Sequence, residues 1–460
     1  MRKNVCVQGL GFVGAAMSTA IALARNENNE LLYNVVGVDL ASEAGRNRIN
    51  AINDGVFPFE TSDQKLIDAI KKAHEQGNLS ATTEISAYAT ADVIIIDIHL
   101  DIPFKDDEPK LEFKSFEQAI RTVAQNMRED ALVIVETTVP PGTCEKVVVP
   151  LISAVFVDRG LDPNKLLLAH SYERVMPGKD YLDSIINFWR VFSGHTKDAG
   201  DLCEQFLSSV INVKKFPLTR LQGTTASETA KVLENTYRAL NIAFIAEWSR
   251  FAEEVGIDLF EVIKAIQMRP THSNIRYPGL GIGGYCLTKD PTFAPAAAKD
   301  FFGLDLDFPF SKMAVKEAAK MPYHAVNKIK AALGQNLERR KILLLGISYR
   351  QDVGDTRYSP SETLYQGLKA SGASVDVHDP MVEFWEEVDV IPFAQLPSFD
   401  EYDAVVFAVP HVLYKKLNLL EKIKNKQEVY VLDAFMVFDS DELKMLRNSG
   451  LKIQAIGIGE

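Results

Sequence analysis

One cysteine stands among residues that could make it reactive. The segment GIGGYCLTKD places Cys286 directly after two glycines, Gly283 and Gly284, and an aromatic residue. Glycine lets a ligand approach the backbone closely, and Lys289 and Asp290 bring charge within a turn of the sulfur, as in an activated thiol. The same letters also fit a flexible turn followed by a helix start with Asp290 near its cap. The local sequence leaves both interpretations open.

The other three cysteines lack such neighbours. Cys6 lies in an apolar run and Cys203 in the helical segment DLCEQFL, so we expect both to be inert packing residues. Cys144 follows PPGT at an expected helix start, where the helix dipole could lower the pKa of its thiol, but no pair of glycines precedes it, and we do not expect it to be a nucleophile. No C-x-x-C pair occurs, so the sequence predicts neither a metal site nor a disulfide framework.

A second group of polar residues has helical spacing. Lys231 and Asn235 are four residues apart and Glu228 is three residues before the lysine, so all three share one helix face. On its own, such a face is expected to be solvated surface. The spacing alone assigns it no function.

The N-terminal segment carries a glycine pattern in the context that nucleotide binding requires. GLGFVG follows the expected strand NVCVQ and precedes an apolar helix. In such a turn the first glycine allows a tight bend, the second lets the backbone approach a pyrophosphate, and the third lets helix and strand pack closely. The expected cofactor-binding residues of this turn are Gly9, Gly11, Phe12, Val13 and Gly14.

An acidic residue ends the next expected strand, NVVGVDL. Asp39 lies somewhat beyond the usual spacing of about 20 residues, and the polar insertion NENNE accounts for the difference. A carboxylate there hydrogen-bonds a ribose diol and repels a 2′-phosphate, which favours NAD over NADP. Glycine-rich turns also occur without a ligand, but strand, helix and Asp39 together predict an NAD site.

Two groups of short apolar runs must position these residues. The first group consists of NVCVQGL, NVVGVDL, ADVIIIDI and ALVIVETT, which alternate with helical stretches and predict a parallel sheet with crossover helices. The second group begins at residue 341 with KILLLG and continues with ASVDVHDP, DAVVFAVP and EVYVLDA. It predicts a second parallel sheet.

A long helix is expected between the two groups. From Gly223 to Val255 apolar residues recur at three- and four-residue steps up to Gly256, an expected C-cap. The predicted fold class is therefore α/β, with two Rossmann-like parallel-sheet domains joined by a central long helix and a helical middle domain. The predicted domains are an N-terminal Rossmann-like domain at 1–222, a helical domain with the thiol segment at 223–335, and a C-terminal α/β domain at 336–460.

Composition limits the partners. The chain has 460 residues, which at roughly 150 residues per domain suggests two or three domains. Its 50 basic and 62 acidic residues give a net charge of -12, which opposes binding to nucleic acid or anionic lipid. No apolar run approaches the roughly 18 residues of a membrane helix, and glycines interrupt the start where a signal peptide would be apolar. We therefore expect a cytoplasmic protein without nucleic-acid or membrane partners.

Six motifs, in order along nearly all of the chain, resemble the UDP-glucose/GDP-mannose dehydrogenase family of NAD-dependent nucleotide-sugar 6-dehydrogenases. They are GLGFVG, ETTVPPGT, SYERVMPG, AKVLENTYRALNIAF, GIGGYCLTKDP and GISYRQDVGDTRYSPS. The resemblance implies NAD as cofactor and a nucleotide sugar, with a UDP-sugar favoured, bound with the help of the C-terminal domain. It also implies a homodimer or higher homo-oligomer built on the long helix.

The resemblance further implies a four-electron oxidation at C6 that supplies polysaccharide biosynthesis. Cys286 captures the aldehyde as a thiohemiacetal, because an aldehyde has no second hydride to give until a nucleophile makes its carbon tetrahedral. Lys231 and Asn235 face the negative charge that develops on the C6 oxygen. By position, Asp290 has the role in proton transfer and Glu173 the role of positioning or activating the hydrolytic water. Thr138 hydrogen-bonds near the same water.

The implied substrate-binding residues include one that departs from the usual pattern. Arg350 stands where many relatives have lysine, which keeps the charge but alters the geometry. The segment Asp97–Pro103, DIHLDIP, replaces a Pro-Thr-Pro-like turn and predicts different cofactor contacts, and LDAFMVFD lacks the arginine with which some members hold the nucleotide sugar. The full substrate-binding set is Glu173, Arg174, Lys231, Asn235, Gly283 and Arg350.

The sugar and two alternative activities stay open. ERVMPG and AVPH resemble members that act on UDP-N-acetylhexosamines, whereas CLTKD resembles the UDP-glucose and GDP-mannose branches. One alternative is a two-electron dehydrogenase of the β-hydroxyacid type, against which GGYC and the segment 341–460 count. The other is an inactive nucleotide-sugar-binding scaffold, which would explain the altered DIHLD and DAFMVFD segments.

Overall fold

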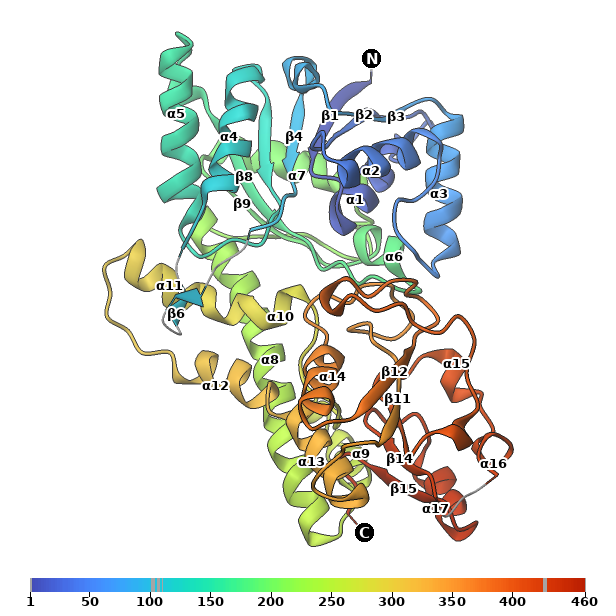
Figure 1. The fold of residues 1–460 in the computed structure, drawn as a ribbon. Helices are drawn as coiled ribbons and strands as arrows, with labels where there is room; N and C mark the ends of the chain where they lie inside the picture. Colours follow the sequence, from blue (N-terminus) through green and yellow to red (C-terminus); the bar gives the residue numbers. More distant parts are fainter. Residues whose placement is uncertain (1, 101–103, 106–107, 110, 425–427, 460) are drawn as a thin grey trace. The chain divides into compact units, whose positions relative to one another are not determined.

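The computed structural model describes residues 2–100, 104–105, 108–109, 111–424 and 428–459. The chain forms two compact units, both visible in Figure 1. Unit 1 contains residues 1–234 and 292–307, and unit 2 contains residues 235–291 and 308–460. The division into three domains at 1–222, 223–335 and 336–460 stays a prediction.

Unit 1 is built on an eight-stranded sheet with the order β10-β9-β8-β7-β4-β1-β2-β3. The paired strands are parallel except for β8 and β9, which run antiparallel. The strands are β1 (Lys3–Gln8), β2 (Tyr33–Val38), β3 (Leu79–Thr82), β4 (Val93–Ile96), β7 (Leu132–Val135), β8 (Leu167–Tyr172), β9 (Val191–Gly194) and β10 (Thr219–Arg220). Two short strands, β5 (Phe104–Lys105) and β6 (Glu108–Pro109), pair separately.

Helices cover both faces of this sheet, so successive residues of one strand enter two different cores. Val5 and Val7 of β1 pack with α1, α3, α6 and α7, whereas Cys6 between them packs with α4 and α5. Figure 1 shows the two groups of helices on either side of the strands. The helices are α1 (Phe12–Ala22), α2 (Glu43–Asn53), α3 (Gln64–Glu75), α4 (Lys114–Asn126), α5 (Val149–Asp158), α6 (Tyr181–Ile186), α7 (Lys197–Val210) and α11 (Phe293–Asp300).

Unit 2 contains a five-stranded parallel sheet with the order β12-β11-β13-β14-β15. Its strands are β11 (Lys341–Leu345), β12 (Ser374–His378), β13 (Ala404–Phe407), β14 (Tyr430–Asp433) and β15 (Lys452–Ala455). One face packs on α13 (Met321–Leu333) and α14 (Pro360–Ala370), and the other packs on α17 (Ser440–Asn448) and α9 (Leu259–Gln267). The shorter helices are α10 (Tyr285–Lys289), α12 (Pro309–Ala318), α15 (Val412–Lys415) and α16 (Leu419–Lys422).

Helix α8 (Thr224–Val255) is the predicted long helix, 32 residues in one piece. It ends at Gly256, whose φ of +75° is the left-handed conformation expected of a C-cap glycine. Its apolar residues at three- and four-residue steps are largely exposed, with Phe244, Trp248 and Phe251 at 50%, 43% and 51%. Within the described parts of the chain, neither α8 nor any other helix combines the length and hydropathy needed to cross a bilayer.

The predicted α/β class is confirmed. All eight runs predicted as strands form strands of the two sheets. Strands β3, β5, β6, β8, β9, β10 and β15 were not expected. The antiparallel pairing of β9 with β8 is the one departure from a purely parallel first sheet among the described strands.

Candidate active site

The glycine turn after β1 has the geometry that the sequence predicted. Gly9 has a φ of +93°, and a Cβ there would lie 2.1 Å from the carbonyl oxygen of Asp97. A Cβ on Gly14 would lie 1.9 Å from the carbonyl oxygen of Gly9. Gly11, in contrast, faces open space, where a Cβ would meet only the His99 ring nitrogen at 3.9 Å. Two glycines therefore close the turn, and the third leaves room for a ligand.

Helix α1 begins at this turn and presents its N-terminus. Among the described residues no side chain caps it, and its first turn contains no acidic residue. Phe12 and Val13 are half-buried at its start. An uncapped helix N-terminus beside an open glycine is a ready anion site, which fits the pyrophosphate of a dinucleotide.

Asp39 lies directly after β2 and already has several partners. Its carboxylate accepts hydrogen bonds from the backbone of Leu40 at 2.7 Å and of Leu10 at 3.3 Å, and from Arg48 Nε at 2.8 Å. The bond to Leu10 ties the acid to the glycine turn. Asp39 therefore stands where a cofactor ribose would be hydrogen-bonded, and Arg48 on α2 fixes its orientation.

The segment at Asp97 is unusual because it buries a second acid beside Glu136. Burial raises the pKa of Asp97 well above its ordinary value, and the neighbouring Glu136 adds to this effect. Burial also raises the pKa of Glu136, which forms a buried ion pair with Arg190. Residues 101–103 of the predicted altered segment Asp97–Pro103 lie outside the described residues.

Glu228 lies under the loop that follows β7 rather than on a solvated face. Its buried carboxylate accepts backbone hydrogen bonds from Gly142 at 2.5 Å and Cys144 at 2.8 Å. Burial raises the pKa of Glu228 to about 7. The pKa of Cys144 is raised well above its ordinary value by burial and by Glu228. The suggestion that a helix dipole lowers the pKa of Cys144 was therefore wrong, because burial and the adjacent acid outweigh the dipole.

The other two cysteines set aside in the sequence are buried as expected. Cys6 in β1 and Cys203 in α7 are at most 2% exposed. Burial raises the pKa of both thiols, that of Cys6 to about 12. Inert thiols of this kind pack as small apolar side chains.

Lys231 and Glu173 meet in unit 1. Lys231 on α8 is only 6% exposed, and its Nζ donates to the carbonyl oxygen of Glu173 at 2.7 Å and lies 3.5 Å from its carboxylate. The ring of Tyr172 lies 5.4 Å from the same ammonium group. The expectation of a solvated helix face was wrong, because this polar row is buried. A buried lysine held by one carbonyl and one carboxylate is positioned to meet a developing negative charge.

Arg174, the neighbouring predicted substrate-binding residue, is turned to another acid. It forms an ion pair with Glu234 at 2.9 Å and donates to the carbonyl oxygen of Trp189 at 2.7 Å. Thr138 is half-buried in the loop after β7. Unit 1 thus brings Lys231 and Glu173 together, while Arg174 points its charge at α8.

Asn235 and Asp290 meet in unit 2. Asp290 is fully buried, and its two carboxylate oxygens accept from Asn235 at 2.6 Å and from Lys289 at 3.0 Å. Asp290 follows the last residue of α10 and serves as its C-cap. Asp290 is also the first residue of the 3-10 turn Asp290–Thr292 that directly precedes α11, so its predicted place near a helix start holds as well. A buried acid between an amide and an ammonium group is held in one geometry, as proton transfer requires.

Cys286 is exposed at the second position of α10. The helix begins after Gly284, whose φ is +86°. A Cβ on Gly284 would lie 2.8 Å from the ring of Tyr349, and one on Gly283 would lie 2.8 Å from Pro360. The two glycines thus let the chain pack tightly against these residues, and that packing fixes where the thiol emerges.

The carboxyl edge of the second sheet carries a cavity of about 190 Å³. It is lined by loops after β11 and β13, the two strands between which the strand order changes direction. Such a switch point is where open parallel sheets bind ligands. Its lining includes the segment 348–351, in which Arg350 is exposed, and Phe435.

Sequence reasoning missed several residues of these sites. Arg48, Glu234 and Tyr349 act as partners of predicted residues, and no local pattern reveals a partner that is distant in sequence. Glu228 was noticed for its spacing, but its contact with Gly142 depends on the fold.

Comparison with known proteins agrees with this geometry. The chain matches three domain models of the UDP-glucose/GDP-mannose dehydrogenase family: the NAD binding domain at residues 3–210, the central domain at 225–316 and the UDP binding domain at 343–440. A UDP-N-acetyl-D-mannosamine dehydrogenase of Pyrococcus horikoshii is 31% identical over 94% of this chain and 95% of that protein.

Solved structures show the same architecture. The structure of the UDP-D-ManNAc dehydrogenase from Pyrococcus horikoshii aligns with a TM-score of 0.82 and 27% identity, covering 99% of both chains. The NDP-N-acetyl-D-galactosaminuronic acid dehydrogenase from Methanosarcina mazei aligns with a TM-score of 0.78 and 26% identity, covering 99% of this chain and 95% of the other. With its nucleotide turn, its buried lysine and its match to all three domain models, the chain belongs to the UDP-glucose/GDP-mannose dehydrogenase family of NAD-binding nucleotide-sugar dehydrogenases.

Proposed function

We propose that the protein oxidises C6 of a UDP-sugar from the alcohol to the carboxylate in two successive two-electron steps, with Cys286 as the covalent nucleophile. The observation that supports this best is the exposed thiol on α10, four residues before the buried Asp290 that Asn235 and Lys289 hold. A dehydrogenase limited to one hydride transfer needs no such thiol.

The glycine turn and Asp39 would hold NAD, which when bound would supply the hydride acceptor for both steps. In the first step Lys231 and Asn235 stabilise the negative charge on the C6 oxygen as the hydroxyl proton leaves. Asp290 passes that proton to solvent through water. The product of this step is an aldehyde that stays bound.

In the second step the thiolate of Cys286 adds to the aldehyde carbon, forming a C–S bond and a tetrahedral thiohemiacetal. Loss of its hydride leaves a thioester. A water molecule placed by Glu173 and Thr138 attacks the thioester carbon, the C–S bond breaks, and the thiolate leaves as the carboxylate forms. Two hydrides are thereby transferred for each sugar oxidised.

The substrate we favour is a UDP-N-acetylhexosamine. The segments ERVMPG and AVPH already resembled that branch, and two relatives are named for UDP-N-acetyl-D-mannosamine or an N-acetylgalactosaminuronic acid. UDP-glucose is the second candidate. The uronic acid formed would supply polysaccharide biosynthesis. A cytoplasmic location stays a prediction.

We also propose that two chains associate through α8. Its exposed row of Tyr237, Phe244, Trp248, Phe251 and Val255 is large for a surface without a partner. The ring centroid of Trp248 lies 5.6 Å from that of Phe251 and 6.2 Å from that of Phe244, so these three side chains form one aromatic patch. A helix that presents such a face suits a two-fold interface with a second copy.

Replacing the thiol tests the mechanism. Cys286→Ser should keep NAD and UDP-sugar affinity, because the change removes little volume, while acid formation collapses. The first hydride transfer should survive at a reduced rate, since it does not use the sulfur. Acid and NADH are measured with the UDP-sugar and, separately, with its 6-aldehyde. Wild-type rates of acid formation in this variant would show that Cys286 is not the nucleophile.

A further inference from the structure

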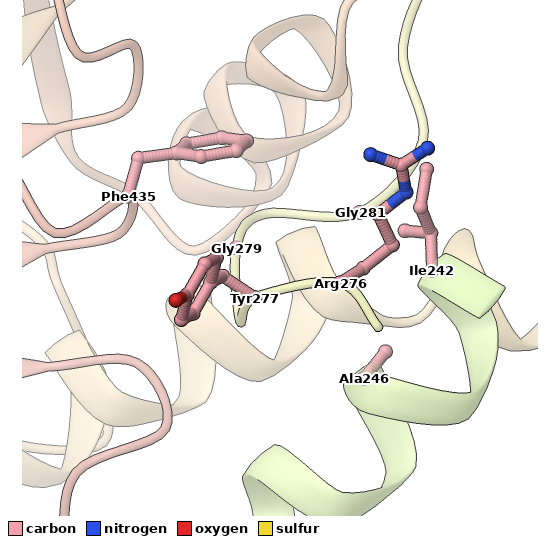
Figure 2. A pocket seen from close by; sticks show the side chains of 7 residues that line it. All are labelled: Ile242, Ala246, Arg276, Tyr277, Gly279, Gly281 and Phe435. Carbon is pink, nitrogen blue, oxygen red and sulfur yellow. The ribbon is translucent and has the colours of Figure 1, made fainter. Parts of the chain in front are cut away.

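Unit 2 contains a second cavity, and its lining includes an arginine that has no carboxylate ion-pair partner among the described residues. It has a volume of about 200 Å³ and is lined by Ile242 and Ala246 of α8, by Arg276, Tyr277, Gly279 and Gly281 of the segment before α10, and by Phe435 after β14. Figure 2 shows the rings of Phe435 and Tyr277 toward one side and the guanidinium of Arg276 toward the other, beside Ile242. The cavity therefore has an aromatic wall and a cationic wall.

Arg276 has a neighbouring cation instead of a counter-ion. Within the described parts of the chain, no carboxylate forms an ion pair with Arg276 or with Arg238 of α8. Partial desolvation lowers the pKa of Arg276, and the positive charge of Arg238 lowers it further. A guanidinium that lines a cavity and is repelled by a second guanidinium attracts an anion from solution.

The rest of the lining is fixed in place. Tyr277 stacks on Phe260 at 5.6 Å and donates to Gln267 at 2.7 Å. Gly281 has a φ of +116°, and a Cβ there would lie 2.4 Å from the carbonyl oxygen of Ala318. A Cβ on Gly279 would lie 2.6 Å from the ring of Phe435. Close packing at both glycines thus fixes the backbone of this segment and leaves no room for a side chain there.

The cavity shares Phe435 with the cavity at the switch point of the second sheet. Phe435 belongs to the segment LDAFMVFD, which has no arginine. At about 200 Å³ the cavity is smaller than the roughly 300–1,000 Å³ that encloses a whole ligand, so it suits a part of the substrate. Because the guanidinium of Arg276 lines the cavity, the part that fits best is the negatively charged diphosphate.

We propose that Arg276 binds the diphosphate of the nucleotide sugar and supplies the cation that the segment around Phe435 lacks. This inference rests on the proposed function. A guanidinium can hold two phosphate oxygens at once, which gives it a geometric advantage over lysine. Arg238 strengthens the attraction, because its positive charge repels the Arg276 guanidinium when no anion is bound at this site. Arg276 is then a substrate-binding residue specific to the diphosphate rather than to the base or the sugar.

Binding of UDP, UMP and uridine, measured by calorimetry, tests the role of Arg276. Arg276→Ala should weaken UDP binding by about ten- to a hundredfold, the loss of a charged hydrogen-bonding group, and should leave uridine binding unchanged. Arg276→Lys should recover part of the affinity. Lys444→Ala, which removes one positive charge from a side chain 72% exposed on α17, is the matched control and should bind UDP like the wild type.

A second variant moves the cation. Phe435→Arg in the Arg276→Ala background should restore UDP affinity at least in part, because it returns a guanidinium to the same cavity. Affinities for NAD and for inorganic pyrophosphate, measured in the same variants, show whether Arg276 acts on the diphosphate of the nucleotide sugar or on that of NAD. NAD affinity should not change, whereas pyrophosphate should lose affinity together with UDP.

The outcomes separate this inference from the proposed function. Unchanged UDP affinity in Arg276→Ala, or an equal loss for UDP and uridine, would overturn the role of Arg276 while leaving the substrate class intact. Failure of the wild-type protein to bind UDP at all would overturn the proposed function itself. An unchanged thermal unfolding midpoint in Arg276→Ala shows that the loss is one of binding.

Discussion

Asp39→Asn should weaken NAD binding and reduce the preference for NAD over NADP. We choose asparagine because its one oxygen can still accept from the backbone of Leu40, whereas alanine would leave both Leu40 and Leu10 without an acceptor. The carboxylate has about four acceptor positions, and three of them already serve Leu10, Leu40 and Arg48. Room is left for about one ribose hydroxyl.

The expected loss follows from that single bond. A hydrogen bond to a charged acceptor contributes about 1.5–3 kcal/mol, so the NAD dissociation constant should rise roughly ten- to a hundredfold. The same change frees Arg48 from its 2.8 Å ion pair, and a guanidinium there suits a 2′-phosphate. NADP affinity should therefore rise, and the ratio of the two constants should move on the order of a hundredfold or more.

Titration of protein fluorescence with each cofactor measures both constants. UDP-sugar affinity is the control and should stay the same. Unchanged NAD affinity in Asp39→Asn would refute the assignment of Asp39 to the ribose, and an unchanged NADP constant would refute the role given to Arg48.

Three further changes test other parts of the structure. Lys231→Met should lower kcat roughly a hundredfold or more while NAD affinity is kept, because a charge stabiliser is lost; a change in KM alone would contradict this role. The pKa of Glu228 is raised to about 7 by folding, so the folded state holds a proton that the unfolded state has released, and stability falls by about 3 kcal/mol as pH rises from about 4.5 to 7. Glu228→Gln should remove that slope in urea unfolding at a series of pH values, and an identical slope would show that Glu228 does not titrate in this range. Trp248→Glu should convert a dimer of about twice 51.1 kDa to the single chain in light scattering, and a wild-type mass of one chain at high concentration would contradict the proposed interface.

Local patterns were sufficient for the residues that act through their own backbone or their own helix. The roles of Gly9 and Gly14 follow from a turn in which no Cβ fits, and the spacing of α8 puts Lys231 and Asn235 on one helix face, although it did not reveal that this face is buried. The eight predicted strands were visible because each lies in a short apolar run that ends abruptly. Strand β8 was missed because it contains His170 and Ser171, buried polar residues that interrupt the apolar pattern.

Contacts between distant segments could not be predicted from one sequence. Nothing local distinguishes the buried Glu228 from an exposed helix acid, because its burial depends on Gly142 and Cys144, more than 80 positions away. The same holds for Arg48 beside Asp39, where packing decides which charges meet, and for Arg276, which lines one cavity with Phe435. The sequence therefore yields candidate reactive groups more readily than the neighbours that orient them.

The stoichiometry of NADH formation tests the four-electron oxidation most directly. A panel of UDP-sugars that includes UDP-N-acetyl-D-mannosamine, UDP-N-acetyl-D-galactosamine and UDP-glucose is incubated with the protein and excess NAD, and NADH absorbance is followed to completion while the product is identified by mass. We predict two NADH per sugar consumed, with the 6-carboxylate as the product and no free aldehyde. One NADH per sugar with a stable aldehyde or ketone would contradict the account and assign the chain to two-electron chemistry.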